Sequence, residues 1–204
     1  MQDLVEALEF EDIEGKVHKG IYHLKDYATP SSAYPRVYVS YSTRLDEDRL
    51  SYLRNSLVEN NFDPHVGTDL SESAMLGGGP VSPDVLTSAM NVIPTCVAFV
   101  SLQSKRSDFS HPDGRYTLPP WLIAEEVFAF SRNVRYLARI RERGVEDPRY
   151  NPSAFNYEFS DESQFRVCVT QLMRDLNAMR QAPEFANALR AARQAQVRIR
   201  SIPN

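Results

Sequence analysis

Residues 36–41, Arg36-Val37-Tyr38-Val39-Ser40-Tyr41, predict a buried β-strand. β-Branched and aromatic side chains dominate this segment, and a proline precedes it. The residues that follow, 42–48, offer hydroxyl and acidic side chains that favour the first turn of a helix. One face of that helix carries three leucines, Leu50, Leu53 and Leu57. We therefore expect a strand, a short polar loop and a helix.

The alternation of strand and helix continues along the chain. Further strands are predicted at 62–66, 95–100, 134–140 and 151–159, and further helices at 83–91, 121–130 and 161–180. This order predicts an α/β fold, a flavodoxin-like five-stranded parallel sheet with helices on both faces and right-handed crossovers. The segment 134–140 alternates basic and apolar residues, so we expect an edge strand whose arginines face the solvent. The last helix should begin at a cap near Asp161 and bury Phe165, Val169, Leu172 and Leu176.

The helix predicted at 120–130 carries two adjacent acidic residues, Glu125 and Glu126. Two prolines set its start, because the fixed φ of proline suits a first helical turn. Trp121 precedes Glu125 by one turn, so its ring can wall a pocket or raise the pKa of that carboxyl. The alternative is an exposed glutamate on a helix that covers the sheet. A helical wheel predicts an apolar face made of Ile123, Ala124, Val127 and Phe128.

Three segments are expected within the 204 residues. An N-terminal extension, 1–34, should hold a short amphipathic helix at 4–10 and a linker at 26–35. A single domain, 35–180, has a length typical of one hydrophobic core. The last segment, 181–204, is a basic C-terminal helix or tail that starts at Pro183. It should contribute little to the core, because few of its residues are apolar.

The composition argues against several functional classes. A formal net charge of −4 argues against a nucleic-acid partner, and no apolar run approaches the ~20 residues that span a membrane. The acidic N-terminus is unlike a secretory signal, and Cys96 and Cys168 lie among apolar neighbours, so a reducing cytoplasm is expected. The four histidines indicate no metal site, because only His18 and His23 lie close together and their spacing fits neither a helix face nor a metal finger. The glycine-rich motifs of dinucleotide and nucleotide phosphate sites are missing from the sequence.

Polar segments follow the predicted strands at their carboxyl ends, where ligands bind in open α/β sheets. These segments are the loop at 41–46, the loop at 67–80, Ser101 and the start of the helix at Trp121. Gly77, Gly78 and Gly79 give the second loop backbone freedom. This loop is either a flexible lid or assembly surface, or a tolerated surface insertion. We expect one polar-rimmed cleft at this edge of the sheet.

Five features, taken in this order, resemble the Toll/interleukin-1 receptor (TIR) domains. They are the strand 37–42 opening into a charged helix, the loop 67–80 in the place of the BB loop, the helix 83–91, the strand 97–101 and the spacing Trp121-x-x-x-Glu125. The resemblance covers residues 35–180. Two features depart from the family. The connection from Ser101 to Trp121 is longer than usual, with a turn signal at 112–114, and the glycine triplet replaces the proline-glycine of the BB loop.

The resemblance implies an NAD+ glycohydrolase or cyclase that cleaves the bond between nicotinamide and ribose, with NAD+ as substrate and no further cofactor. Glu125 matches the catalytic glutamate of the family. A carboxylate in that position can stabilise the oxocarbenium-like charge that builds on the ribose. The substrate-binding residues implied are Tyr41, Ser42 and Arg44 on one wall, Trp121 on the other, and Asp69 and Ser101 at neighbouring strand ends.

The chain is similar to free-standing bacterial TIR proteins, many of which act in anti-phage defence. The resemblance therefore implies self-association through TIR–TIR contacts, with Gly77, Gly78 and Gly79 in the assembly loop. It also implies a phage-derived trigger or a downstream effector as a further partner. Two alternatives stay open. One is a non-enzymatic TIR scaffold, interaction module or virulence factor, and the other is an enzyme similar to nucleoside deoxyribosyltransferases, which also uses a glutamate at a ribose.

Overall fold

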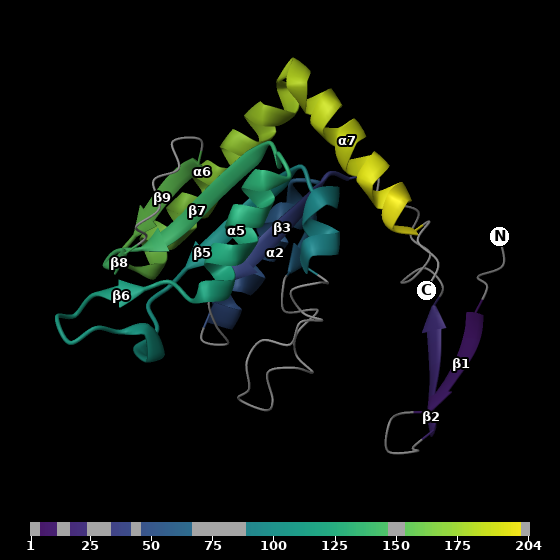
Figure 1. The fold of residues 1–204 in the computed structure, drawn as a ribbon, viewed down its shortest axis with the longest axis horizontal. Helices are drawn as coiled ribbons and strands as arrows, with labels where there is room; N and C mark the ends of the chain where they lie inside the picture. Colours follow the sequence, from purple (N-terminus) through teal and green to yellow (C-terminus); the bar gives the residue numbers. More distant parts are fainter. Residues whose placement is uncertain are drawn as a thin grey trace. The chain divides into compact units, whose positions relative to one another are not determined.

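The computed structural model describes residues 5–11, 17–23, 34–41, 46–66, 89–146 and 154–200. The chain divides into two compact units, Met1–Tyr34 and Pro35–Asn204. Figure 1 shows the first as a hairpin and the second as a sheet covered by helices. Among the residues described in these ranges, no helix combines the length and the apolar character needed to cross a membrane.

The first unit contains an antiparallel hairpin. Strand β1 (Val5–Glu11) pairs with β2 (Val17–His23), so that Val5 lies opposite His23. The amphipathic helix expected at 4–10 is therefore wrong. A helix of seven residues has a costly nucleus and few backbone hydrogen bonds, whereas the β-prone segment at 17–23 offers a partner along the whole strand. Most of the linker expected at 26–35 lies outside the described residues.

The second unit is built on a five-stranded parallel sheet in the order β4-β3-β5-β7-β9. Its strands are β3 (Arg36–Tyr41), β4 (Asp63–Val66), β5 (Ala98–Gln103), β7 (Tyr136–Glu142) and β9 (Ala154–Phe159). This order confirms the predicted flavodoxin-like α/β sheet. The edge position expected for the segment 134–140 is wrong, because β7 lies between β5 and β9 and its first five residues are buried.

Helices cover both faces of the sheet (Figure 1). On one face lie α2 (Glu47–Glu59) and α6 (Glu162–Gln181), which bury the leucines and the Phe165 row predicted for them. The Asp161 side chain caps α6 as expected, accepting a hydrogen bond from the Gln164 N–H at 2.9 Å. The other face is covered by α5 (Pro120–Ser131) and by the helical residues 89–92, which continue into the 3-10 turn η3 (Ile93–Thr95). Most of the helix predicted at 83–91 lies outside the described residues.

The long connection between β5 and α5 forms a small substructure at the carboxyl end of the sheet. It contains the 3-10 turn η4 (Ser107–Phe109) and strand β6 (Tyr116–Thr117), which pairs in parallel with β8 (Val145–Glu146). The predicted turn at 112–114 is confirmed. Gly114 adopts φ +82°, a value that favours glycine, and its N–H donates to the His111 carbonyl at 3.0 Å.

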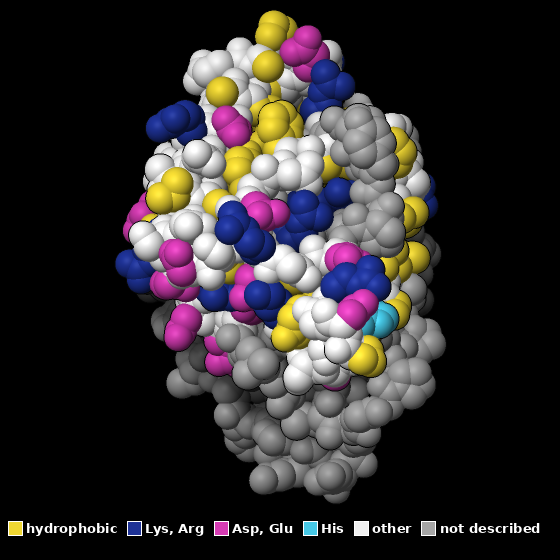
Figure 2. Space-filling view, turned by 90° about the vertical axis from the view of Figure 1, so that its left-hand side faces the viewer, with side chains coloured by type: hydrophobic (Ala, Val, Ile, Leu, Met, Phe, Trp, Pro, Cys, Tyr) yellow, Lys and Arg dark blue, Asp and Glu magenta, His cyan; other side chains and the backbone are white. Residues whose placement is uncertain are grey.

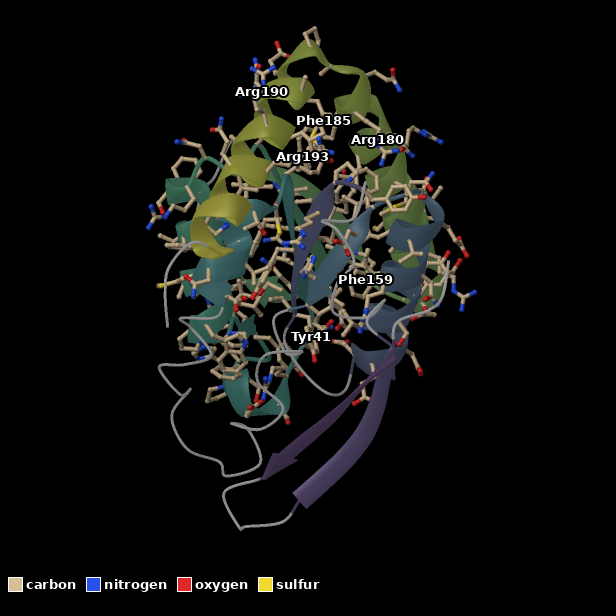
Figure 3. All side chains as sticks on the ribbon, turned by 90° about the vertical axis from the view of Figure 1, so that its right-hand side faces the viewer. Tyr41, Phe159, Arg180, Phe185, Arg190 and Arg193 are labelled. Atoms are coloured by element: carbon tan, nitrogen blue, oxygen red, sulfur yellow. The ribbon has the colours of Figure 1, made fainter. Side chains whose placement is uncertain are left out.

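The C-terminal helix α7 (Pro183–Arg200) starts at the predicted proline. Figure 3 shows Phe185 where α7 leaves α6. Phe185 and Ala192 are buried in the same core cluster as the inner faces of α2 and α6, and Leu189 packs against that cluster. The expectation that this segment contributes little to the core is therefore wrong. A few apolar residues suffice because they share one helical face.

We expect Phe185→Ala to lower the free energy of unfolding by about 3 kcal/mol, because it leaves a cavity in the core cluster. Phe130→Ala is the matched control: Phe130 also lies on a helix but is 57% exposed, so its loss should cost less than about 1 kcal/mol. Urea unfolding of both variants measures the difference. Equal, small losses would show that α7 is not part of the folded core.

Candidate functional site

A row of buried polar side chains crosses the sheet beneath α5. Ser40 of β3 lies beside Ser101 of β5, and Ser101 lies beside Arg139 of β7. The three residues are at most 4% exposed, with Ser40 at 1%, Ser101 at 0% and Arg139 at 4%. A buried polar group costs free energy unless it is hydrogen-bonded. This row therefore requires polar partners within the fold.

Glu125 of α5 is one of these partners. The Tyr38 hydroxyl donates to its Oε1 at 3.0 Å, and the Ser40 hydroxyl donates to its Oε2 at 2.5 Å. Tyr38 and Ser40 lie two residues apart on β3, so both point toward the same face of the sheet. Glu125 itself is 7% exposed, which rules out the alternative of an exposed glutamate. Each carboxylate oxygen thus has a hydroxyl donor from the same strand.

Glu126, the next residue along α5, pairs with the arginine of the same row. Arg139 donates from Nε to Glu126 Oε1 at 2.9 Å and also from Nη2 to this oxygen. Both side chains are 4% exposed. The expectation that the arginines of this strand face the solvent is therefore wrong for Arg139. The guanidinium can be buried because its charge is matched by the carboxylate.

The buried face of α5 differs from the helical-wheel prediction. It consists of Leu122, Glu125, Glu126 and Ala129, while Val127 is 55% and Phe130 57% exposed. Of the face predicted to be apolar and buried, Ala124 and Val127 are exposed and Ile123 and Phe128 are half-buried. The prediction failed because the sheet offers hydroxyls and a guanidinium at this position, so the helix turns its carboxylates inward.

The surroundings of Glu125 favour its protonated form. Burial raises the pKa of this carboxyl, and the hydrogen bonds from Ser40 and Tyr38 oppose that rise in part. Burial, followed by the charge of Glu125, raises the pKa of Tyr38 above its ordinary value, so this phenol stays a neutral donor. The site is a carboxyl held by two hydroxyl donors, and it retains its proton to a higher pH than a solvated glutamate does.

Trp121 is the second residue of α5, and it contacts the connection that precedes the helix. Its ring packs edge to face on Phe109, with centroids 5.9 Å apart, and the Arg106 guanidinium lies 5.3 Å from the ring centre. The contacts of Trp121 therefore run toward the connection, whereas those of Glu125 run toward β3. None of these contacts joins the Trp121 ring to the Glu125 carboxyl, which were expected to lie against each other.

The remaining predicted site residues fall into two groups. Ser101 is buried beside Ser40 and accepts a hydrogen bond from Gln103 Nε2 at 3.3 Å. Tyr41 packs against the core cluster beneath α2 and α6, on the face opposite Glu125, so the structure does not bring it to this carboxyl. Outside the described residues lie Ser42, Arg44, Asp69, Gly77, Gly78 and Gly79.

Sequence reasoning missed Tyr38, Ser40 and Arg139. A signal for the first two was present, because their hydroxyls are two residues apart in the strand and so point to the same face of the sheet. Arg139 gave no such signal, since an arginine in a strand is usually a surface charge. Its role depends on Glu126, which only the fold brings to it.

Within the described ranges, no group of three or more His, Cys, Asp or Glu side chains could hold a metal ion. Cys96 and Cys168 are free and buried, and burial raises the pKa of the Cys96 thiol to about 12, so it stays protonated and unreactive at neutral pH.

Ion pairs tie helices to strands near the carboxyl ends of the sheet. Arg49 of α2 pairs with Asp46, with Glu142 of β7 and with Glu162 of α6, at 3.3–3.6 Å. Figure 2 shows Lys and Arg side chains interspersed with Asp and Glu on the face that it presents. Partly exposed pairs of this kind contribute at most about 1 kcal/mol each. Together, the ion pairs of Arg49 hold α2 and α6 beside β7.

Comparison of the sequence with protein-family models gives no match, and comparison with curated proteins gives none. The class of protein defined so far is that of its architecture, a flavodoxin-like α/β sheet with a buried, hydrogen-bonded glutamate beneath one helix.

Replacing Glu125 by glutamine should change how stability depends on pH. Burial raises the pKa of Glu125 above its ordinary value of 4.5, so the folded chain binds this proton more tightly than the unfolded chain. The wild type should therefore lose stability relative to Glu125→Gln as the pH rises from 4.5 through the raised pKa. Urea unfolding of both proteins at increasing pH measures this. A difference that is constant with pH would contradict it.

Breaking the buried ion pair should be costly. Arg139→Met leaves the Glu126 carboxylate buried without this cation, so we expect a loss of about 3–5 kcal/mol in the free energy of unfolding. The double variant Glu126→Met/Arg139→Met should lose less than the sum of the two single variants. Arg143→Met is the matched control, because its pair with Glu158 is exposed and should contribute about 1 kcal/mol or less. Equal losses in the two arginine variants would contradict a structural role for this pair.

Proposed function

We propose that this protein is a TIR-type NAD+ glycohydrolase or cyclase in which Glu125 is the catalytic residue. The observation that carries the proposal is the hydrogen-bonded carboxyl of Glu125 beside Ser40, close to the carboxyl end of β3. Ligands of open α/β sheets bind at these strand ends. The strand order supports the proposal, because it is that of a flavodoxin-like sheet with β3 inside.

The reaction breaks the bond between the nicotinamide nitrogen and ribose C1. The bonding electron pair leaves with nicotinamide, and positive charge builds on the ribose, where a carboxylate stabilises it. An acceptor hydroxyl then bonds to C1 and gives up its proton. Water yields linear ADP-ribose, and a hydroxyl of the same or another molecule yields a cyclic or conjugated product.

Glu125 must be ionised to stabilise this charge. Its burial opposes ionisation in the free protein. NAD+ carries a positive charge on its nicotinamide ring, and a cation near a carboxyl favours the carboxylate. Binding of the substrate thus prepares the catalytic group. Tyr38 and Ser40 act as positioning residues, since their hydroxyls fix the direction of both carboxylate oxygens.

The proposal includes self-association and a role in bacterial anti-phage defence, with a phage-derived trigger or a downstream effector. If subunits complete one another's sites, the activity per molecule should rise with protein concentration. Measuring nicotinamide release across a concentration series, beside the oligomeric state, tests this part. Full activity in a monomer at every concentration would remove self-association from the proposal.

Glu125→Gln should reduce nicotinamide release from NAD+ by about a hundredfold or more, because the amide cannot stabilise a cationic transition state. Glu126 is unsuitable as a control, since it neutralises Arg139. Glu158→Gln serves instead, because Glu158 is exposed on β9, and it should retain full activity. Unfolding curves of both variants confirm that they fold.

Retained turnover in Glu125→Gln would overturn the assignment of the catalytic residue. Base exchange on deoxynucleosides without NAD+ cleavage would favour the deoxyribosyltransferase alternative.

One observation favours the non-enzymatic interaction module. Val127 and Phe130 of α5 are more than half exposed, at 55% and 57%, although Glu125 and Glu126 of the same helix are buried. The two side chains are three residues apart and so lie on one side of the helix, where a second protein could contact both. A wild-type protein that releases no nicotinamide at any concentration, yet self-associates, would support this module over the enzyme.

A further inference from the structure

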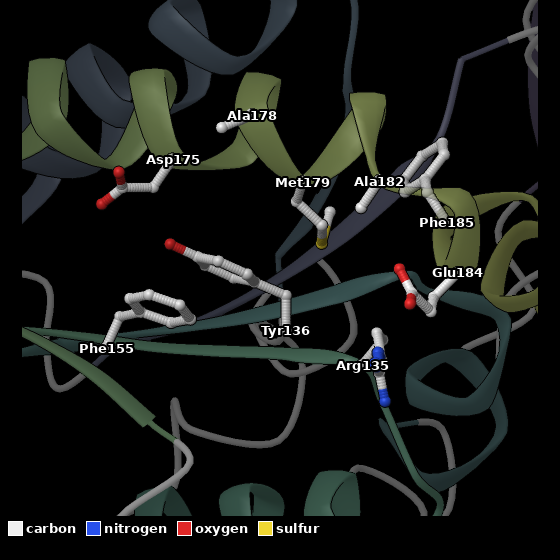
Figure 4. A pocket seen from close by; sticks show the side chains of 9 residues that line it. All are labelled: Arg135, Tyr136, Phe155, Asp175, Ala178, Met179, Ala182, Glu184 and Phe185. Atoms are coloured by element: carbon white, nitrogen blue, oxygen red, sulfur yellow. The ribbon is translucent and has the colours of Figure 1, made fainter.

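A cavity of about 480 Å³ lies on the face of the sheet opposite Glu125. It is formed where β7 and β9 begin and where α6 passes into α7 (Figure 4). Its volume lies within the range of small-molecule sites, about 300–1,000 Å³. The proposed reaction at Glu125 makes no use of this cavity, because the sheet separates the two.

The walls of the cavity are mainly apolar. The rings of Tyr136 and Phe155 stack with centroids 4.5 Å apart and an angle of 12° between their planes. Phe155 is 47% exposed, so part of its ring is available to a ligand. Met179 and Phe185 complete the walls, and Figure 4 shows Met179 directed from α6 toward the strands. Aromatic faces and an adaptable thioether suit a flat apolar group.

The charges in the cavity are two carboxylates and one guanidinium. Figure 4 shows Asp175 at one end, and Glu184 with Arg135 at the other. Asp175 Oδ2 accepts a hydrogen bond from the Tyr157 hydroxyl at 2.6 Å, and that hydroxyl contacts the Tyr136 hydroxyl at 2.9 Å. A carboxylate has about four acceptor positions, so Asp175 keeps capacity for a further donor. The net charge of the lining is therefore negative.

We propose that this cavity binds a small organic cation with a flat apolar body, such as an arylalkylamine. The aromatic walls attract both the ring and the charge of such a ligand, since the face of an aromatic ring is electron-rich. The carboxylates at the two ends supply acceptors for the ammonium group. An anion of the same shape has only Arg135 to meet it and faces repulsion from both carboxylates.

A ligand in this cavity contacts α6 and α7 together, since Met179 belongs to the first helix and Phe185 to the second. Binding to the folded chain alone raises the apparent stability. The ligand should therefore also raise the melting temperature, which gives a measurement that does not depend on any activity at Glu125.

Isothermal titration of the full chain with 2-phenylethylamine, 2-phenylethanol and 3-phenylpropanoate tests the proposal. We expect the amine to bind at least about fivefold more tightly than the neutral alcohol, the size of one cation–π or ion-pair contact, and the carboxylate to bind most weakly. Tighter binding of the carboxylate than of the amine would overturn the proposal, and so would no binding of the amine at millimolar concentration.

Variants assign the binding to this cavity. Glu184→Gln should weaken amine binding about fivefold, and Arg135→Gln should strengthen it, because the competing cation is removed. Phe155→Ala should weaken the amine and the alcohol alike. The matched control is Asp48→Asn on α2, an exposed acid that does not line the cavity, and it should leave binding unchanged. Equal effects of Glu184→Gln and Asp48→Asn would overturn the proposal.

Glu125→Gln should bind the amine as tightly as the wild type does. Failure of the amine proposal can therefore be told apart from failure of the NAD+ proposal.

Discussion

The burial of two adjacent carboxylates beneath α5 is the constraint on which the rest of this structure depends. Glu125 and Glu126 can face the sheet only because β3 offers hydroxyls and β7 offers a guanidinium at matching positions along the strands. The register of β5 sets these positions, since β5 pairs with both strands. A slip of one residue in either strand would turn its polar side chain to the other face and leave a carboxylate buried without its donor. The polar contacts thus specify the register of the central sheet.

The two glutamates differ in the charge of their partners. Glu126 is neutralised by Arg139 and anchors the helix. Glu125 meets only neutral hydroxyls among its described hydrogen bonds, so no protein cation in those contacts would cancel its charge once it ionises. A carboxylate that is positioned yet not neutralised is available to a cationic substrate, which is what the proposed cleavage of NAD+ requires. Under this proposal Glu126 cannot take the place of Glu125, because Arg139 already neutralises its carboxylate.

Much of the fold could be predicted from the sequence because it depends on local patterns. The leucine face of α2 and the Phe165 row follow from helical periodicity, and the parallel sheet follows from the alternation of strands and helices. The Asp161 cap follows from the preference of aspartate for that position. The central position of β7 could not be predicted from the sequence. Arg139 reads as a surface charge, because nothing in the sequence indicates that it pairs with Glu126, thirteen residues away. The inward turn of Glu125 has the same origin: the sequence marks the residue, but only packing of α5 on β3 supplies its two donors.

Because α5 turns its two acidic side chains toward the sheet, apolar side chains lie on its outer surface. The twelve residues of this helix include two ionisable side chains, and both are buried. The outward face, with Val127 and Phe130, therefore carries no charge of its own at any pH. An association through this face would not be screened by added salt, and ions excluded from protein surfaces, such as sulfate, would strengthen it. The strength of such a contact would depend on the apolar area of Val127 and Phe130 that it buries rather than on the titration of α5 side chains.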